Sequence, residues 1–127
     1  MLFKKRDFLL FTGDSVTDAG RNYPLGEGEG SGTGYVRHIN TLLNAFYPEL
    51  YLRISNTGIS GNTSRDLRGQ WEQAALQFQP DWLSICIGIN DVWRHYDDPC
   101  LWACEVFIDE YRENLEYLLS TAQKCVK

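Results

Sequence analysis

The chain has 127 residues, of which 12 are Lys or Arg and 17 are Asp or Glu, giving a net charge of −5 at pH 7. This length suits a single domain that buries roughly two thirds of the surface of its unfolded chain. Because nucleic acids and anionic membranes are themselves negatively charged, the acidic balance argues against both as partners.

The amino terminus combines a basic cluster, Lys4-Lys5-Arg6, with an apolar run of only four residues, Phe8-Leu9-Leu10-Phe11. This run is too short for the apolar core of a signal peptide, and no stretch approaches the length of a membrane span. We therefore expect a cytoplasmic protein without a membrane span.

The first apolar run ends at Gly13-Asp14-Ser15, the pattern of a strand that is buried on both faces and stops at a turn. Ligands bind at the carboxyl edge of the strands in open parallel α/β sheets, which makes Ser15 a candidate functional residue. Gly, Asp and Ser also form turns for structural reasons alone, so these three residues do not decide between the two interpretations.

A glycine-rich stretch, residues 26–34, follows. It lacks a G-x-G-x-x-G motif and a P-loop lysine, and Glu27 and Glu29 would repel phosphate. We predict a flexible loop at the rim of the site. The apolar spacing over residues 33–46 then predicts an amphipathic helix, with His38 on its exposed side.

Two further strand and helix units complete the chain. Residues 51–56 alternate as a strand, and Thr63 to Asp66 form a variant capping box at the start of a helix that Pro80 ends. Residues 82–87 form a third apolar strand, which ends at Gly88-Ile89-Asn90-Asp91, and apolar residues from 108 to 126 recur at helical spacing.

Strands that alternate with helices predict an α/β fold with a parallel sheet in the order 2-1-3. The turns that carry Ser15, Gly58 and Asn90 then lie at one edge. The backbone N–H groups of Ser15 and Gly58 and the amide of Asn90 are candidate donors to the oxyanion that forms when a serine attacks an ester.

These residues lie in three blocks that resemble the SGNH hydrolases, also called the GDSL lipase/esterase family. The blocks are Gly13-Asp14-Ser15-Val16-Thr17-Asp18-Ala19-Gly20-Arg21, Asn56-Thr57-Gly58-Ile59-Ser60-Gly61-Asn62-Thr63 and Gly88-Ile89-Asn90-Asp91. The resemblance implies a flavodoxin-like three-layer α/β/α fold, a small-molecule carboxylic ester as substrate, and no metal or organic cofactor. It also implies that Ser15 is the nucleophile and that Ser15, Gly58 and Asn90 form the oxyanion hole.

The fourth block of this family, an Asp-x-x-His that supplies the general base and its orienting acid, has no counterpart in the chain. Neither His38 nor His95 has an aspartate three residues before it. We therefore interpret residues 1–127 as one incomplete SGNH domain, truncated after about three strands, and expect weak or no esterase activity. The acyl and alcohol groups of the substrate are not specified by the sequence.

Several other residues have two interpretations. His95 follows Asn90 by five residues and is a candidate substitute base, with Asp97 and Asp98 nearby, although a loop histidine is usually only solvated. The aromatic residues after Asn90 either line an acyl or sugar subsite or pack in the core; they are Trp93, Tyr96 and Trp102. Asp14 and Asp18 are expected to fix loops by accepting hydrogen bonds.

The four cysteines, Cys86, Cys100, Cys104 and Cys125, are predicted to be free thiols, with Cys86 a small core residue. The C-x3-C spacing of Cys100 and Cys104 lacks the second ligand pair of a zinc site.

The third strand would have an uncovered outer edge, which predicts self-association. Two rival functions remain at this point. One is a non-catalytic module that binds acyl esters or carbohydrate, and the other is a flavodoxin-like nucleotide-binding domain, which the two glutamates of the glycine-rich loop disfavour.

Overall fold

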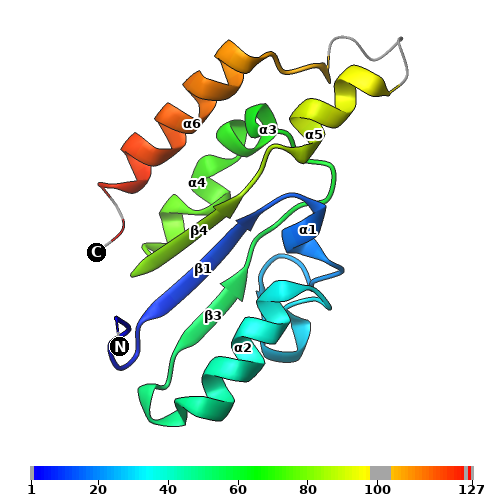
Figure 1. Cartoon of the computed structure of the whole chain (residues 1–127). Helices are drawn as coiled ribbons and strands as arrows, with labels where there is room; N and C mark the ends of the chain where they lie inside the picture. Colours follow the sequence, from blue (N-terminus) through cyan, green and yellow to red (C-terminus); the bar gives the residue numbers. More distant parts are fainter. Residues whose placement is uncertain (1, 98–103, 125, 127) are drawn as a thin grey trace.

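Three parallel strands form the centre of the fold. The computed structural model describes residues 2–97, 104–124 and 126. Strand β1 (Phe8–Gly13) lies between β3 (Arg53–Asn56) and β4 (Trp82–Cys86) and is parallel to both (Figure 1). This confirms the predicted 2-1-3 order of the three parallel strands and places their carboxyl ends at one edge of the sheet.

A short fourth strand, β2 (Gly26–Glu27), pairs antiparallel with β3, so the sheet has the order β2-β3-β1-β4. The glycine-rich stretch is therefore not the free rim loop that we predicted. The Glu27 carboxylate accepts hydrogen bonds from Arg53 Nε at 2.8 Å and Ser55 Oγ at 2.5 Å, which ties the loop to β3. The negative charge of Glu27, which disfavours phosphate binding, thus has a structural role.

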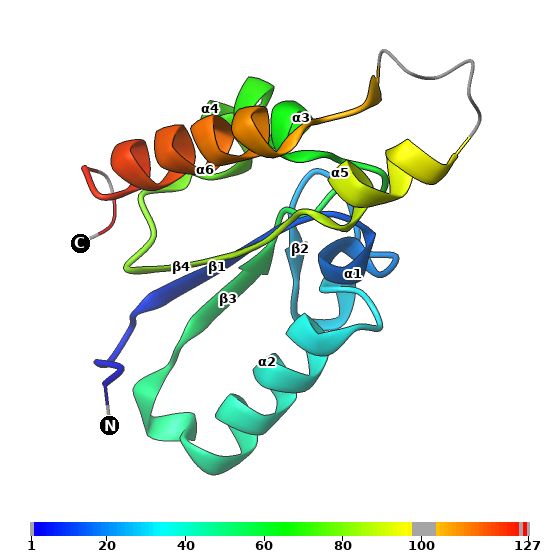
Figure 2. The ribbon, with the colours of Figure 1, turned by 45° about the horizontal axis from the view of Figure 1, so that its top comes forward.

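Helices cover both faces of the sheet and confirm the three-layer α/β/α architecture. Helix α2 (Tyr35–Phe46) lies on one face, and α3 (Ser64–Gly69), α4 (Trp71–Ala74) and α6 (Ile108–Ala122) lie on the other (Figures 1 and 2). Because side chains alternate along a strand, Leu9 and Phe11 of β1 pack toward α2, while Phe8 and Leu10 pack against the helices opposite.

The helix predicted after Thr63 is divided into three pieces: α3, α4 and a 3-10 turn, η3 (Leu76–Phe78). Its start is confirmed, because Thr63 and Asp66 form a reciprocal capping box. The first break follows Gly69, and glycine weakens a helix interior by its backbone freedom. The shorter elements of the described chain are α1 (Ser15–Asp18), η1 (Gly28–Gly30), η2 (Pro48–Leu50), α5 (Ile89–Trp93) and η4 (Arg94–Tyr96).

Strand β4 lies at the sheet edge, and this overturns one prediction. Cys86, expected in the core, is an exposed free thiol, because β4 has a neighbouring strand on only one side. Cys104 is also free and exposed, while Cys100 and Cys125 lie outside the described residues. No helix among the described residues is long and apolar enough to cross a membrane, and no cluster of metal-ligating side chains occurs among them.

Candidate active site

Ser15 is the first residue of α1, directly beyond the end of the central strand. Asp14 caps this helix by accepting a hydrogen bond from the Val16 N–H at 2.9 Å. Gly13 is required just before the turn, because a Cβ there would lie 2.0 Å from the carbonyl oxygen of Cys86. These contacts leave the Ser15 side chain exposed at the carboxyl edge of the sheet.

Hydrogen bonds join the three turns at this edge. The N–H of Ile59 donates to the carbonyl of Gly13 at 2.9 Å, and the N–H of Asp14 donates to the carbonyl of Cys86 at 3.3 Å. The third link is the Asn90 side chain, whose Nδ2 donates to the carbonyl of Asn62 at 2.9 Å. The structure therefore brings together the turns that carry the candidate nucleophile and the candidate amide donor.

Asn56, the last residue of β3, holds α1 in place. It is fully buried, and its Nδ2 donates to the carbonyls of Thr17 at 2.5 Å and Ser31 at 2.9 Å. Its Oδ1 accepts the N–H of Gly58 at 2.9 Å. No role was predicted for Asn56 from the sequence, although a polar side chain at the end of a buried strand was a usable signal.

Asp18 fixes the other end of α1, as expected. Its carboxylate accepts hydrogen bonds from the Tyr23 hydroxyl at 2.8 Å, from both the N–H and the hydroxyl of Ser60, and from the Arg21 N–H. Burial alone would raise the pKa of Asp18, but these hydrogen bonds favour the charged form and lower the pKa below 3.8. Asp18 is thus an ionised structural group.

Gly58, expected as an oxyanion donor, has its N–H engaged by Asn56 and its carbonyl by Arg21 Nε at 2.6 Å. Its lack of a side chain serves close packing, since a Cβ would lie 2.5 Å from the backbone nitrogen of Asp18. The geometry therefore does not support Gly58 as a donor to substrate.

The N–H of Gly61, in the same turn, is a better candidate for the oxyanion donor than the N–H of Gly58. Within the described part of the chain, the N–H groups of Ser15 and Gly61 have no hydrogen-bond acceptor. Gly61 also has a φ of +87°, which favours glycine, and it directly precedes the Asn62 carbonyl that Asn90 contacts. No role was predicted for Gly61, the second glycine of the block, from the sequence.

Asp91 secures the turn that carries Asn90. Its buried carboxylate accepts hydrogen bonds from the N–H of Ser64 at 2.9 Å and from its hydroxyl at 2.5 Å. Asn114 of α6 donates to the same hydroxyl at 3.0 Å. The start of α5 is therefore attached to both α3 and α6, which fixes the position of Asn90.

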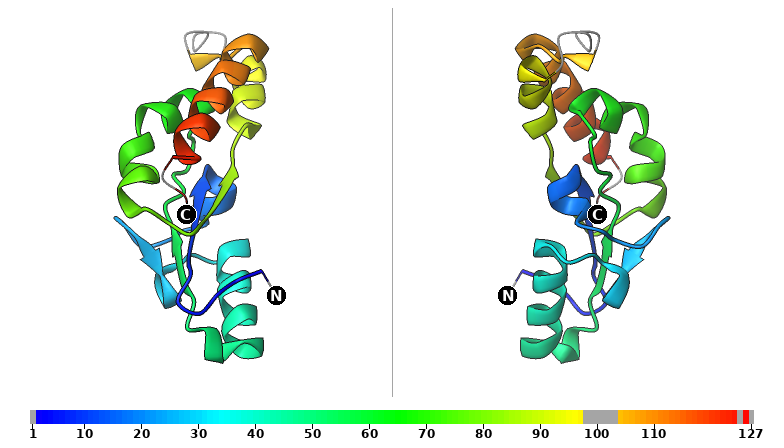
Figure 3. Two further views of the ribbon diagram at one scale, coloured as in Figure 1. Left: turned by 90° about the vertical axis from the view of Figure 1, so that its left-hand side faces the viewer. Right: turned by 90° about the vertical axis from the view of Figure 1, so that its right-hand side faces the viewer.

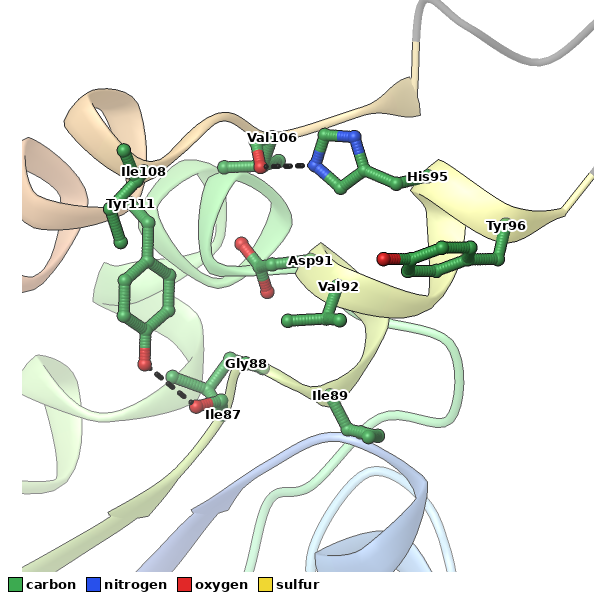
Figure 4. Close-up of a pocket in the computed structure, with 10 residues that line it drawn as sticks. All are labelled: Ile87, Gly88, Ile89, Asp91, Val92, His95, Tyr96, Val106, Ile108 and Tyr111. Atoms are coloured by element: carbon green, nitrogen blue, oxygen red, sulfur yellow. Dashed lines mark hydrogen bonds between the residues drawn. The ribbon is translucent and has the colours of Figure 1, made fainter. Parts of the chain in front are cut away.

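The structure does not bring His95 to Ser15. Figure 4 shows its ring directed at the segment before α6, where Nε2 lies 3.0 Å from the carbonyl of Val106. Nδ1 lies 3.3 Å from a carboxylate oxygen of Glu105, so both ring nitrogens are engaged. His38 is exposed on α2, and Ser15 Oγ has no hydrogen bond among the described residues.

A pocket of about 570 Å³ lies beyond the end of β4 (Figure 4). Its lining includes Gly88, Asp91 and Tyr111 but not Ser15. Trp93, expected to line a substrate subsite, is 61% exposed and lies outside this lining, so its role stays a prediction. Asp98 and Trp102 lie outside the described residues.

A three-layer α/β/α fold with an exposed serine at the end of its central parallel strand is the arrangement of the SGNH hydrolase class. Comparison with known proteins agrees with this. The model of the GDSL-like lipase/acylhydrolase family matches residues 11–126, and the chain belongs to this family.

Known relatives resemble the chain closely over only part of their length. An acetylxylan esterase from Geobacillus stearothermophilus is 52% identical over 121 residues, which are 94% of this chain and 55% of the esterase. The crystal structure of the acetylxylan esterase Axe2 from that organism matches with a TM-score of 0.95 and 50% identity, covering the whole chain and 59% of Axe2. An α/β hydrolase, LAE5, from the metagenome of Lake Arreo has a TM-score of 0.92 and 40% identity over 98% of this chain and 59% of LAE5.

Catalytic mutants of Axe2 replace a serine numbered 15, and an aspartate and a histidine numbered beyond 127 in that protein. The chain spans somewhat more than half the length of these relatives.

Proposed function

We propose that the chain supplies the nucleophile and the oxyanion donors of a serine carboxylester hydrolase that removes acetyl groups from a carbohydrate. The observation that carries the proposal is the exposed Ser15 at the end of β1. The N–H groups of Ser15 and Gly61 have no acceptor among the described residues, and hydrogen bonds join their turns to the turn that carries the Asn90 amide. The acetyl and carbohydrate parts of the proposal rest on the acetylxylan esterase that is 52% identical.

In this reaction, Ser15 Oγ attacks the acyl carbon, and the carbonyl oxygen gains the negative charge. The N–H groups of Ser15 and Gly61 and one hydrogen of Asn90 Nδ2 donate to this oxyanion, while the second Nδ2 hydrogen stays on the Asn62 carbonyl. Donors that are already held in place need no reorganisation when the charge develops, which is usually the largest contribution to catalysis.

Proton transfer is the part that these 127 residues do not provide. Both nitrogens of His95 are engaged by Val106 and Glu105, and the family's Asp-x-x-His is absent from the sequence. Loss of the base removes about 10⁴- to 10⁶-fold in turnover from serine hydrolases. We therefore propose that residues 1–127 alone are a very weak esterase or an inactive one.

The test measures p-nitrophenyl acetate hydrolysis by residues 1–127 and by a chimera in which they are joined to the remaining carboxyl-terminal part of the Geobacillus esterase. We expect the chimera to be at least about 10⁴-fold faster. In the chimera, Ser15→Ala should abolish turnover, and Asn90→Ala should lower kcat by about 10²- to 10³-fold. Ser120→Ala, on the exposed side of α6, is the matched control and should change nothing.

Two outcomes would contradict the proposal. Substantial turnover by residues 1–127 that disappears in Ser15→Ala would show that a base is present within the chain. A folded chimera that lacks all Ser15-dependent turnover would instead favour a non-catalytic module that binds acyl esters or carbohydrate.

A further inference from the structure

A second pocket has a volume of about 680 Å³ and shares no lining residue with the pocket beyond β4. It is bounded by the loop that follows α1, by the turn after β3, and by α4 and η3. Ser15 does not line it. The residues that carry its chemistry are a buried arginine, two aromatic side chains and three glutamines: Arg21, Tyr23, Phe78, Gln70, Gln73 and Gln77.

Arg21 offers unused donors in this pocket although its side chain is buried. Only 5% of the residue is exposed, and its Nε and Nη1 donate to the carbonyls of Gly58, Asn22 and Pro24 at 2.6 to 3.1 Å. Its Nη2 has no acceptor among the described residues. A guanidinium has five N–H donors, so two remain available to a ligand.

Of the three glutamines, Gln70 lies between α3 and α4, Gln73 lies in α4, and Gln77 lies in η3. Gln70 Oε1 accepts a weak hydrogen bond from Asn62 Nδ2 at 3.4 Å, and Gln77 Nε2 donates to the carbonyl of Gln73 at 2.7 Å. The Gln73 amide has no partner among the described residues. An amide both donates and accepts, which matches a hydroxyl group.

The remaining wall is apolar except for Thr57, whose hydroxyl donates to the carbonyl of Ala74 at 2.7 Å, and no carboxylate lines it. Tyr23 is 60% exposed, and the Arg21 guanidinium lies 3.9 Å from the centre of its ring. The Asp18 carboxylate, which accepts the Tyr23 hydroxyl, partly balances the arginine charge from behind. The pocket therefore combines apolar surface with neutral amides rather than a strong positive field.

We propose that this pocket is a carbohydrate-binding subsite. The C–H face of a sugar ring packs against Tyr23 and Phe78, and its hydroxyls bond to the amides of the three glutamines and to Arg21 Nη2. The pocket is linked to the candidate active site through α1. Tyr23, which lines the pocket, donates a hydrogen bond to Asp18 at the end of this helix, and Ser60 donates to the same carboxylate. The choice of sugar rests on the proposed function, whereas binding itself does not require catalysis.

The test is a titration of the ¹⁵N-labelled 127-residue chain with xylotriose, followed by NMR. Side-chain amide signals of the three pocket glutamines should shift with saturation at millimolar ligand. Gln73→Ala, which removes no hydrogen bond of the fold, should weaken binding at least about fivefold. Gln123→Ala, a glutamine at the end of α6, is the matched control, and Ser15→Ala tests independence from the candidate nucleophile; neither should change the affinity.

Three results would overturn the subsite. They are the absence of saturable shifts up to about 20 mM xylotriose, equal affinity in Gln73→Ala, and binding of glucuronate at least about tenfold tighter than xylotriose, which would indicate a carboxylate site. Because the readout is binding, an inactive chimera with intact xylotriose binding would disprove the proposed hydrolysis and leave the subsite standing.

Discussion

The two sides of the central strand differ in how completely they are built. On one side, every residue of β3 after Arg53 is buried, and β2 covers part of its outer edge. On the other side, no residue of β4 is fully buried, and its outer edge has no strand beside it within the described chain (Figure 3). The β3 side of the sheet is therefore covered by a neighbouring strand, while the outer edge of β4 is open.

Apolar hollows accompany the open side on both faces of the sheet. One of about 190 Å³ is lined by Phe3 and Trp82, and one of about 250 Å³ is lined by Leu83, Leu119 and other residues. An edge strand with apolar surface beside it is a template for pairing with another chain. We propose that this edge self-associates when nothing else covers it.

The largest effect is expected at Asn56, the last residue of β3, and it contrasts with Cys86, the last residue of β4. Asn56→Ala leaves the Gly58 N–H and the carbonyls of Thr17 and Ser31 without their buried partner, and should cost about 3–5 kcal/mol of unfolding free energy. Cys86→Ala, at the exposed end of β4, should change it by less than about 0.5 kcal/mol. Urea denaturation measures both, and equal effects would contradict the distinction between the two sides.

A smaller effect is expected for association through the open edge. Leu83→Lys places a charge between the two hollows and should weaken self-association at least about tenfold, because the charge must be buried in the contact. Leu42→Lys, on the exposed side of α2, is the control. Sedimentation velocity over a concentration series compares them. A wild-type chain that stays monomeric throughout would disprove the proposal, and equal weakening by both variants would point to non-specific contact.

The smallest effect concerns acid stability at Asp18. The pKa of Asp18 is lower in the folded chain than its ordinary value of 3.8, so its ionised form stabilises the fold above that pH. This contribution is lost as the pH falls through the folded pKa. Asp18→Asn should therefore flatten the stability profile below about pH 4, whereas Ser120→Ala on α6, which involves no ionisable group, should leave its slope unchanged. Thermal unfolding from pH 2 to 7 measures the slopes.

The layers, the strand order and the capping box were predictable because each depends on local periodicity or on a short motif. The apolar run of β1 predicted a strand buried on both faces, and Thr63 with Asp66 predicted a helix start. The pairing of β2 with β3 was not predictable, since it depends on Glu27 contacting Arg53 and Ser55 more than twenty residues away.

The placement of Ser15 and Asn90 at one edge of the sheet was predictable, because each follows the end of a strand. The choice between Gly58 and Gly61 as the candidate oxyanion donor was not, because it depends on which N–H already has a hydrogen-bond acceptor. The sequence shows that the turn contains two glycines, but it does not show which of their N–H groups has a hydrogen-bond acceptor. The exposure of Cys86 likewise depends on what lies beside β4, which its own apolar run does not reveal.

The contact between Asn90 and the Asn62 carbonyl has a consequence for how activity is divided along the chain. Since only the NH₂ end of the amide can bond to a carbonyl, the contact fixes the orientation of Asn90 before any substrate arrives. Under the proposed function, the donors that stabilise the oxyanion are therefore held in place within residues 13–91, and proton transfer is a separate step that needs a base. A base free in solution, such as imidazole, acts on the same serine but lacks the high effective molarity of a tethered group.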